Sequence, residues 1–61
     1  MKKYVSRAGF RDSTDYVLVS ADYSVVVVTK DGQRQFWGSL VMKSLARYAV
    51  ESGKWVEAQA A

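Results

Sequence analysis

The fold of this 61-residue chain is decided by residues 23–37, which read YSVVVVTKDGQRQFW. Asp31-Gly32 favours a type I′ turn, in which both central residues take a positive φ. The four valines before the turn suit a strand, because branched side chains favour the pleated, half-buried surface of a sheet. We therefore predict an antiparallel hairpin with arms at residues 23–29 and 33–37.

A two-residue turn also fixes which side chains share a face of the hairpin. It places Val27 opposite Phe36 and Val26 opposite Trp37, and directly opposed residues lie on the same face. Each face then carries valines and one large aromatic side chain. An antiparallel sheet with one side in water would alternate apolar and polar residues, so this hairpin is expected to be covered on both sides. Phe36 is expected to point into the core, whereas Trp37 lies on the face without an obvious cover.

Residues 16–20 form another strand-like run, which extends the hairpin to an antiparallel meander of three strands over residues 16–37. Residues 3–7 would add a fourth strand at an edge. Residues 1–11 are therefore either a basic arm or an edge strand of a single domain that spans residues 1–61. The N-terminal segment with Tyr4, Val5 and Phe10, or a second copy of the chain, would cover the second face.

The other clear element is a helix over residues 39–52. Ser39 can cap its first free N–H groups, and Gly53 suits the left-handed position that follows many helices. Apolar side chains recur at helical spacing, namely Val41, Leu45, Tyr48 and Ala49, with Met42 and Ala46 beside them. We expect this side of the helix to pack on the sheet and the opposite side to face solvent. The residues expected on the solvent side are Lys43, Ser44, Arg47 and Glu51.

After the helix, Trp55 and Val56 are expected to fold back onto the core, and residues 57–61 to form a frayed tail. The predicted architecture is a small α+β domain. It consists of an antiparallel meander of three or four strands, followed by one C-terminal helix packed on one face.

Composition excludes most enzymes. The chain has no cysteine, no histidine and no proline, and its formal net charge is +3. It therefore has no thiolate or imidazole for nucleophilic, general-base or zinc chemistry, and it is short for a substrate pocket. We expect a protein that is not an enzyme, with no cofactor, no metal and no small-molecule substrate.

Size and patterning point to a partner. Domains of this size usually rely on disulfides, a metal or a partner chain, and here the partner is the simplest of the three. We therefore expect a homodimer or a bound protein. No stretch approaches the roughly 20 apolar residues of a membrane span, and no apolar segment follows Met1-Lys2-Lys3, so the expected location is cytoplasmic.

Surface binding is the function class that remains. We expect a small inhibitor or adaptor that acts by protein–protein contact, of a size common among phage and mobile-element proteins. Exposed aromatic and arginine side chains are frequent anchors of protein interfaces. The candidate contact residues are Trp37, Arg34, Lys43, Arg47, Tyr4, Arg7 and Arg11.

Nucleic-acid binding is the alternative. Residues 1–11 carry four basic residues and no acid. Arg34 stands near Phe36 and Trp37, and such cationic and aromatic side chains on a sheet can hold phosphates and stack bases. The order of three strands and a helix over residues 16–52 resembles small DNA-binding sheet domains, such as the arm-binding domains of phage integrases. This resemblance is architectural and no motif accompanies it, so the sequence leaves both partner classes open.

Overall fold

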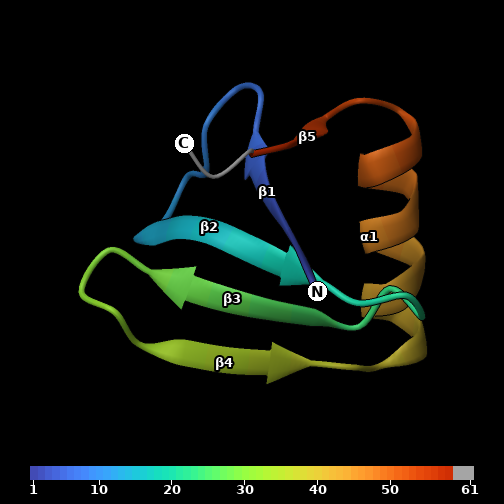
Figure 1. Ribbon diagram of the computed structural model, residues 1–61, viewed down its shortest axis with the longest axis horizontal. Coiled ribbons are helices and arrows are strands. Elements are labelled where there is room, and N and C mark those ends of the chain that lie inside the picture. Colours follow the sequence, from blue (N-terminus) through green and yellow to red (C-terminus); the bar gives the residue numbers. More distant parts are fainter. Residues whose placement is uncertain (59–61) are drawn as a thin grey trace.

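The computed structural model describes residues 1–58, which form five strands and one helix (Figure 1). The strands are β1 (Lys2–Ser6), β2 (Thr14–Val19), β3 (Val25–Thr29), β4 (Arg34–Trp37) and β5 (Trp55–Glu57). The helix α1 (Leu40–Glu51) connects β4 to β5. All five strands belong to one antiparallel sheet in the order β4-β3-β2-β1-β5. The predicted α+β meander with one helix packed on it is confirmed, and its sheet has more strands than expected.

The additional pairing involves both ends of the chain. β1 pairs with β2 on one side and with β5 on the other. Residues 1–11 are therefore neither a free arm nor an edge strand, because β1 lies inside the sheet. The expected fold-back after the helix is confirmed, but it is a strand, and Glu57 belongs to it rather than to a frayed tail. The last part of the predicted tail, residues 59–61, lies outside the described residues.

The β3–β4 loop has three residues and not two. The Thr29 N–H donates to the Gln33 carbonyl (2.8 Å), so residues 30–32 form the loop. Only Gly32 in this loop has a positive φ, at +89°. Since Asp31 keeps a negative φ, the prediction of a type I′ turn is wrong. A type I turn followed by a left-handed glycine is the common three-residue alternative.

The extra loop residue moves every β4 side chain to the other face of the sheet. Val26 lies opposite Phe36, and Val27 lies opposite Gln35. The predicted pairs of Val27 with Phe36 and of Val26 with Trp37 are therefore wrong. Phe36 is exposed instead of entering the core, and Trp37 shares the helix side of the sheet with Val27.

The core lies between α1 and one face of the sheet. Its buried cluster contains Val17, Val19, Val25 and Ala46. Half-buried side chains packed against this cluster are Tyr4, Phe10, Tyr23, Val27, Met42 and Trp55. Tyr4 and Phe10 thus complete the core on the helix side and do not cover the second face. α1 runs from the β4 side to the β5 side (Figure 1).

The length of α1 matches this crossing. β4 and β5 are the two edges of the sheet, so the connection must span four strand spacings of about 4.8 Å each. The helix has 12 residues, which extend over about 18 Å. One helix of this length therefore carries the chain across the whole sheet.

The side of α1 that faces the sheet differs from the prediction. The helix occupies the predicted residues, and the Ser39 hydroxyl accepts the Met42 N–H (3.1 Å) as its N-cap. Ala49 is buried as predicted, together with Ala46. The other three predicted inner residues, Val41, Leu45 and Tyr48, are exposed. Small side chains allow a close approach of the helix to the valines of the sheet, and the larger ones are left outside.

Candidate functional site

Several large apolar side chains of this protein lie outside its core. Among residues 1–58, the buried apolar residues are all valines and alanines: Val17, Val19, Val25, Val28, Ala46 and Ala49. Six exposed large apolar residues come from one continuous segment, residues 36–48. They are Phe36 (69% exposed), Trp37 (47%), Leu40 (82%), Val41 (72%), Leu45 (56%) and Tyr48 (59%). Leucine, valine and phenylalanine are normally buried, so this segment is the most unusual part of the surface.

Four of these residues form a ridge on α1, which we call the helix ridge: Leu40, Val41, Leu45 and Tyr48. Positions three and four apart are neighbours on a helix surface, so Val41, Leu45 and Tyr48 follow one another over about 10 Å. The Lys54 Nζ lies 5.1 Å from the centroid of the Tyr48 ring, at the C-terminal end of the ridge. The ridge exposes on the order of 100 Å² per side chain, which places it among the larger apolar patches of monomeric proteins.

A second surface is the face of the sheet that points away from α1, which we call the open sheet face. The strand registers place nine side chains on it: Lys3, Val5, Tyr16, Leu18, Val26, Val28, Arg34, Phe36 and Val56. Of these, only Val28 is buried. The open sheet face therefore combines apolar and aromatic side chains with two cations and no carboxylate.

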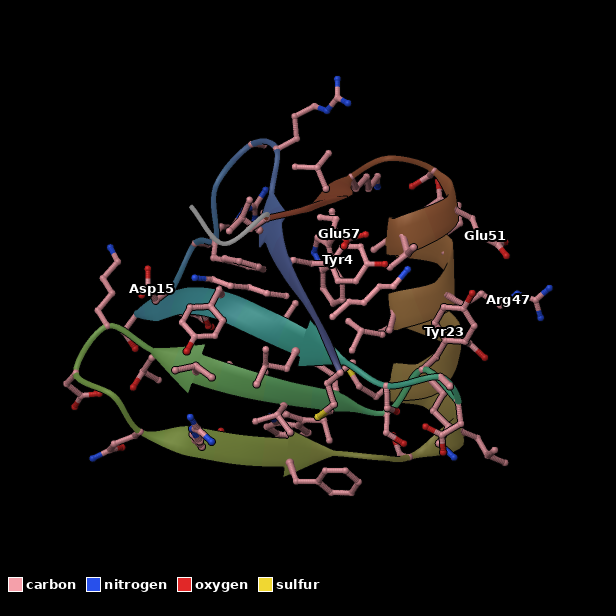
Figure 2. The ribbon with its side chains drawn as sticks, in the orientation of Figure 1. Tyr4, Asp15, Tyr23, Arg47, Glu51 and Glu57 are labelled. Carbon is pink, nitrogen blue, oxygen red and sulfur yellow. The ribbon has the colours of Figure 1, made fainter. Side chains whose placement is uncertain are left out.

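The two predicted contact residues on α1, Lys43 and Arg47, each form an ion pair. The Lys43 Nζ lies 3.3 Å from the Asp22 Oδ2, and the Arg47 Nε lies 3.2 Å from the Glu51 Oε2. Arg47 and Glu51 project from α1 away from the sheet (Figure 2). These two cations are on the molecular surface, but neither is available as an unpaired charge.

The other predicted contact residues are scattered over the molecule. Tyr4 is half-buried and packs on the core beneath α1. Arg7 and Arg11 are exposed in the segment between β1 and β2. Arg34 and Trp37 are both exposed on β4, but they point to opposite faces of the sheet. The structure thus does not bring the seven predicted residues together in one site.

Sequence reasoning missed both surfaces. It assigned Val41, Leu45 and Tyr48 to the core, because their spacing is that of a packed helix face. It also did not single out Lys3 and Tyr16, whose shared face follows only from the registers of β1, β2 and β3. A three-residue reading of the β3–β4 loop would have placed Arg34 and Phe36 together on the face of Val26 and Val28.

The aspartates in the turns serve local structure. The Asp22 carboxylate accepts hydrogen bonds from the Ser20 hydroxyl and the Ser24 N–H, and these bonds together with Lys43 hold its pKa far below the usual range. A hydrogen bond from the Thr29 hydroxyl likewise lowers the pKa of Asp31. These carboxylates remain ionised and satisfied within their own turns.

Open clefts lie between the elements of residues 1–58. One, of about 460 Å³, is lined by Tyr4, Tyr23 and Val50 among others, and its Lys2 Nζ lies 3.8 Å from Glu57 Oε1. Another, of about 490 Å³, lies between Arg7 and Lys54. Within residues 1–58, no three or more acidic residues gather in a way that could hold a metal ion. The clefts offer no arrangement of side chains that defines a reaction.

Comparison with known proteins gives no assignment: no protein-family model, no curated protein and no solved structure matches the chain. The architectural resemblance to integrase arm-binding domains gains no support from a solved structure. The described part of the chain also contains no helix long and apolar enough to cross a membrane.

Proposed function

We propose that this chain is a non-enzymatic binding protein, an inhibitor or adaptor that acts by protein–protein contact through the helix ridge and Trp37. The observation that carries the proposal is that small apolar side chains are buried while several large ones are exposed. The buried apolar side chains of residues 1–58 are those of valines and alanines, while Trp37, Leu40, Leu45 and Tyr48 face solvent. A contact of this kind needs no disulfide or oxidising environment, and we propose the cytoplasm as its compartment.

Several features of the ridge support a protein as its partner. A helix that lays apolar residues spaced at i, i+4 and i+7 into a groove is a recurrent mode of protein recognition. Tyrosine and tryptophan are frequent at the centres of such contacts, because they bury a large area at a low cost in conformational entropy. Tyr48 and Trp37 supply these anchors, and the Arg47–Glu51 pair leaves the neighbouring helix surface electrically balanced.

The ridge would also accept a second copy of the chain. Two antiparallel helices related by a two-fold axis near Leu45 would place Tyr48 against the second copy's Val41. The ridge and Trp37 expose roughly 500 Å² per copy, compared with about 800 Å² per partner in a standard stable interface. We therefore propose weak self-association and tighter binding to a larger protein.

Affinity capture from nuclease-treated host lysate tests the protein-binding proposal. The wild type is compared with the double variant Val41→Ser/Leu45→Ser and with Arg47→Ala as a matched change on the same helix. We expect a specific protein that is retained by wild type and Arg47→Ala and lost with the ridge variant. Retention by all three proteins, or no specific capture by the wild type, would contradict the proposal.

Sedimentation velocity between about 10 and 200 µM protein tests self-association separately. The expected wild-type result is a rising weight-average mass that the ridge variant does not show. A monomer at every concentration would contradict the proposal of self-association. Binding to a larger protein would then be tested by the capture experiment alone.

A further inference from the structure

The open sheet face carries a second set of features that the helix ridge does not explain. The registers arrange its central side chains in two rows across the strands. Lys3, Leu18, Val26 and Phe36 form one row. Tyr16, Val28 and Arg34 form the next. Each row therefore contains one aromatic side chain and one cation on an otherwise aliphatic surface.

The two cations of this face have no carboxylate to neutralise them. The ion pairs within residues 1–58 involve Lys2, Lys43 and Arg47, and none includes Lys3 or Arg34. No aspartate or glutamate belongs to either row. Lys3 on β1 and Arg34 on β4 lie three strand spacings apart, about 14 Å. They therefore mark two separate positions for negative charge on this face, one on edge strand β4 and one on the inner strand β1.

The aromatic side chains lie between and beside these positions. Phe36 is largely exposed. The Lys3 Nζ lies 4.3 Å from the centroid of the half-buried Tyr16 ring, a cation–π contact that keeps the ammonium group over the sheet. The half-buried Leu18 and Val26 form an apolar floor between the rings. Such a surface suits a ligand with flat apolar groups joined by anionic links.

We propose that the open sheet face binds single-stranded nucleic acid. Bases stack on Phe36 and on the apolar floor next to Tyr16, while Lys3 and Arg34 each contact a phosphate. Aromatic platforms flanked by cations are the general means of binding single strands without base-specific readout. The site is independent of the helix ridge, because it lies on the opposite face of the sheet.

Charge complementarity favours this ligand over a second copy of the chain. Two sheets packed face to face need apolar inner faces. A second open sheet face would bring two further cations against Lys3 and Arg34, with no carboxylate from either copy to pair with them. A polyanion uses these charges, whereas a second copy would have to bury or displace them.

Asp15 provides an internal check on the electrostatics. It lies at a bulge of β2 next to Tyr16, at the end of this strand away from α1 (Figure 2). Because Asp15 is next to Tyr16 in the sequence, its negative charge would repel a phosphate bound near that ring. Asp15→Asn should therefore strengthen binding, by up to roughly twofold at low salt.

Fluorescence anisotropy with a labelled dT8 oligonucleotide, at 50 and 200 mM salt, tests the proposal. Two phosphate contacts on a single strand predict a slope of about −1.4 in log–log form, which is about a sevenfold loss of affinity over this range. Arg34→Ser should reduce the slope to about −0.7. Phe36→Ser should weaken binding roughly tenfold without changing the slope. Arg47→Ser removes the same charge from the helix and is the matched control, expected to change neither quantity.

Three results would overturn the proposal. The first is no binding of dT8 by the wild type at 50 mM salt and 100 µM protein. The second is an equal effect of Arg34→Ser and Arg47→Ser, which would show attraction by net charge alone. The third is a wild-type dimer in sedimentation that becomes a monomer with Phe36→Ser, which would assign the face to a second copy. The Leu45→Ser variant should bind dT8 as the wild type does. A failure of the nucleic-acid proposal can therefore be told apart from a failure of the ridge proposal.

Discussion

Asp22 is the residue that ties the β2–β3 turn to the helix. Its carboxylate accepts hydrogen bonds from Ser20 and from the Ser24 N–H (3.1 Å), and it lies 3.3 Å from the Lys43 Nζ on α1. These partners lower the pKa of Asp22, the Ser20 hydroxyl most of all. The turn and the N-terminal half of the helix are therefore held together by a group that must stay ionised.

This lowered pKa predicts how the free energy of unfolding depends on pH. A carboxyl whose pKa is depressed in the folded state stabilises the fold above its unfolded pKa of about 3.9, and this stabilisation is lost as the pH falls toward the folded value. We expect an unfolding free energy that is flat between pH 7 and 5 and falls below about pH 4. Asp22→Asn should be less stable at pH 7 and should show a smaller acid-induced loss.

Urea unfolding at pH 7, 5 and 3 measures this effect. Asp15→Asn is the control, because Asp15 takes part in none of the ion pairs or hydrogen bonds found in residues 1–58. Asp12 and Asp31 also have lowered pKa values, so the acid-induced loss should shrink with Asp22→Asn and not vanish. An unchanged loss would assign the acid sensitivity to those other turns.

The length of the β3–β4 loop decides the register of β4. Gly32 takes the left-handed conformation in a type I′ turn and in a three-residue loop alike, so Asp31-Gly32 predicts the turn but not its length. The difference rests on Asp31, whose carboxylate accepts hydrogen bonds from the Thr29 hydroxyl and the Gln33 N–H. These local bonds accompany the negative φ of Asp31, and the Asp-Gly pair by itself does not reveal them.

At the scale of the element, α1 allows a direct test of its orientation. Leu45 is exposed and Ala46 is fully buried, although the two are adjacent in sequence. Leu45→Ser should reduce the unfolding free energy by less than about 1 kcal/mol, as surface changes do. Ala46→Leu should cost about 1–3 kcal/mol, because the added atoms must push the helix away from the valines of the sheet.

Chemical denaturation of the two variants, with circular dichroism to confirm the helix, decides between orientations. A large loss for Leu45→Ser with tolerance of Ala46→Leu would restore the orientation that spacing alone indicated. The comparison also tests a requirement of the ridge proposal. If Leu45 is a surface contact residue, the protein should still fold after Leu45→Ser.

The strands and the helix were predictable to different degrees for physical reasons. Local signals were sufficient for β3 and for α1, with Ser39 as its cap. The buried side of the helix was not predictable, because Met42 and Ala46 on one side and Val41 and Leu45 on the other are all apolar. Residue spacing cannot tell which of two apolar sides of a helix faces the sheet. In α1 the side with the small alanines packs against the sheet. The β1–β5 pair joins segments about 50 residues apart, and no local pattern encodes it.

At the scale of the whole molecule, the sequence predicted which kinds of residue are exposed but not where on the surface they lie. Arg34 and Trp37 are exposed as expected, yet they lie on opposite faces of the sheet. Lys43 and Arg47 are on the helix as expected, yet each faces a carboxylate. Charge pairing and side-chain direction depend on the assembled sheet and helix, so composition could name the kind of surface and not its location.

The stability of the assembled molecule should depend on closing the sheet at β5. A domain of this length has roughly 3–9 kcal/mol of stability in total. Trp55 packs on the core cluster, and its ring centroid lies 6.2 Å from that of Phe10 in an edge-on contact. Trp55→Ala should therefore cost about 3 kcal/mol or more, enough to leave a large unfolded fraction at 25 °C.

Phe36→Ala is the matched comparison, because it removes another aromatic ring from a strand at the opposite edge of the sheet. Phe36 is mostly exposed, so its loss should cost less than about 1 kcal/mol. Urea midpoints of the two variants measure the difference. Similar losses would mean that β4 and β5 close the sheet equally and that Phe36 belongs to the core. A large loss for Trp55→Ala alone would place the core on the helix side and leave Phe36 free for a ligand.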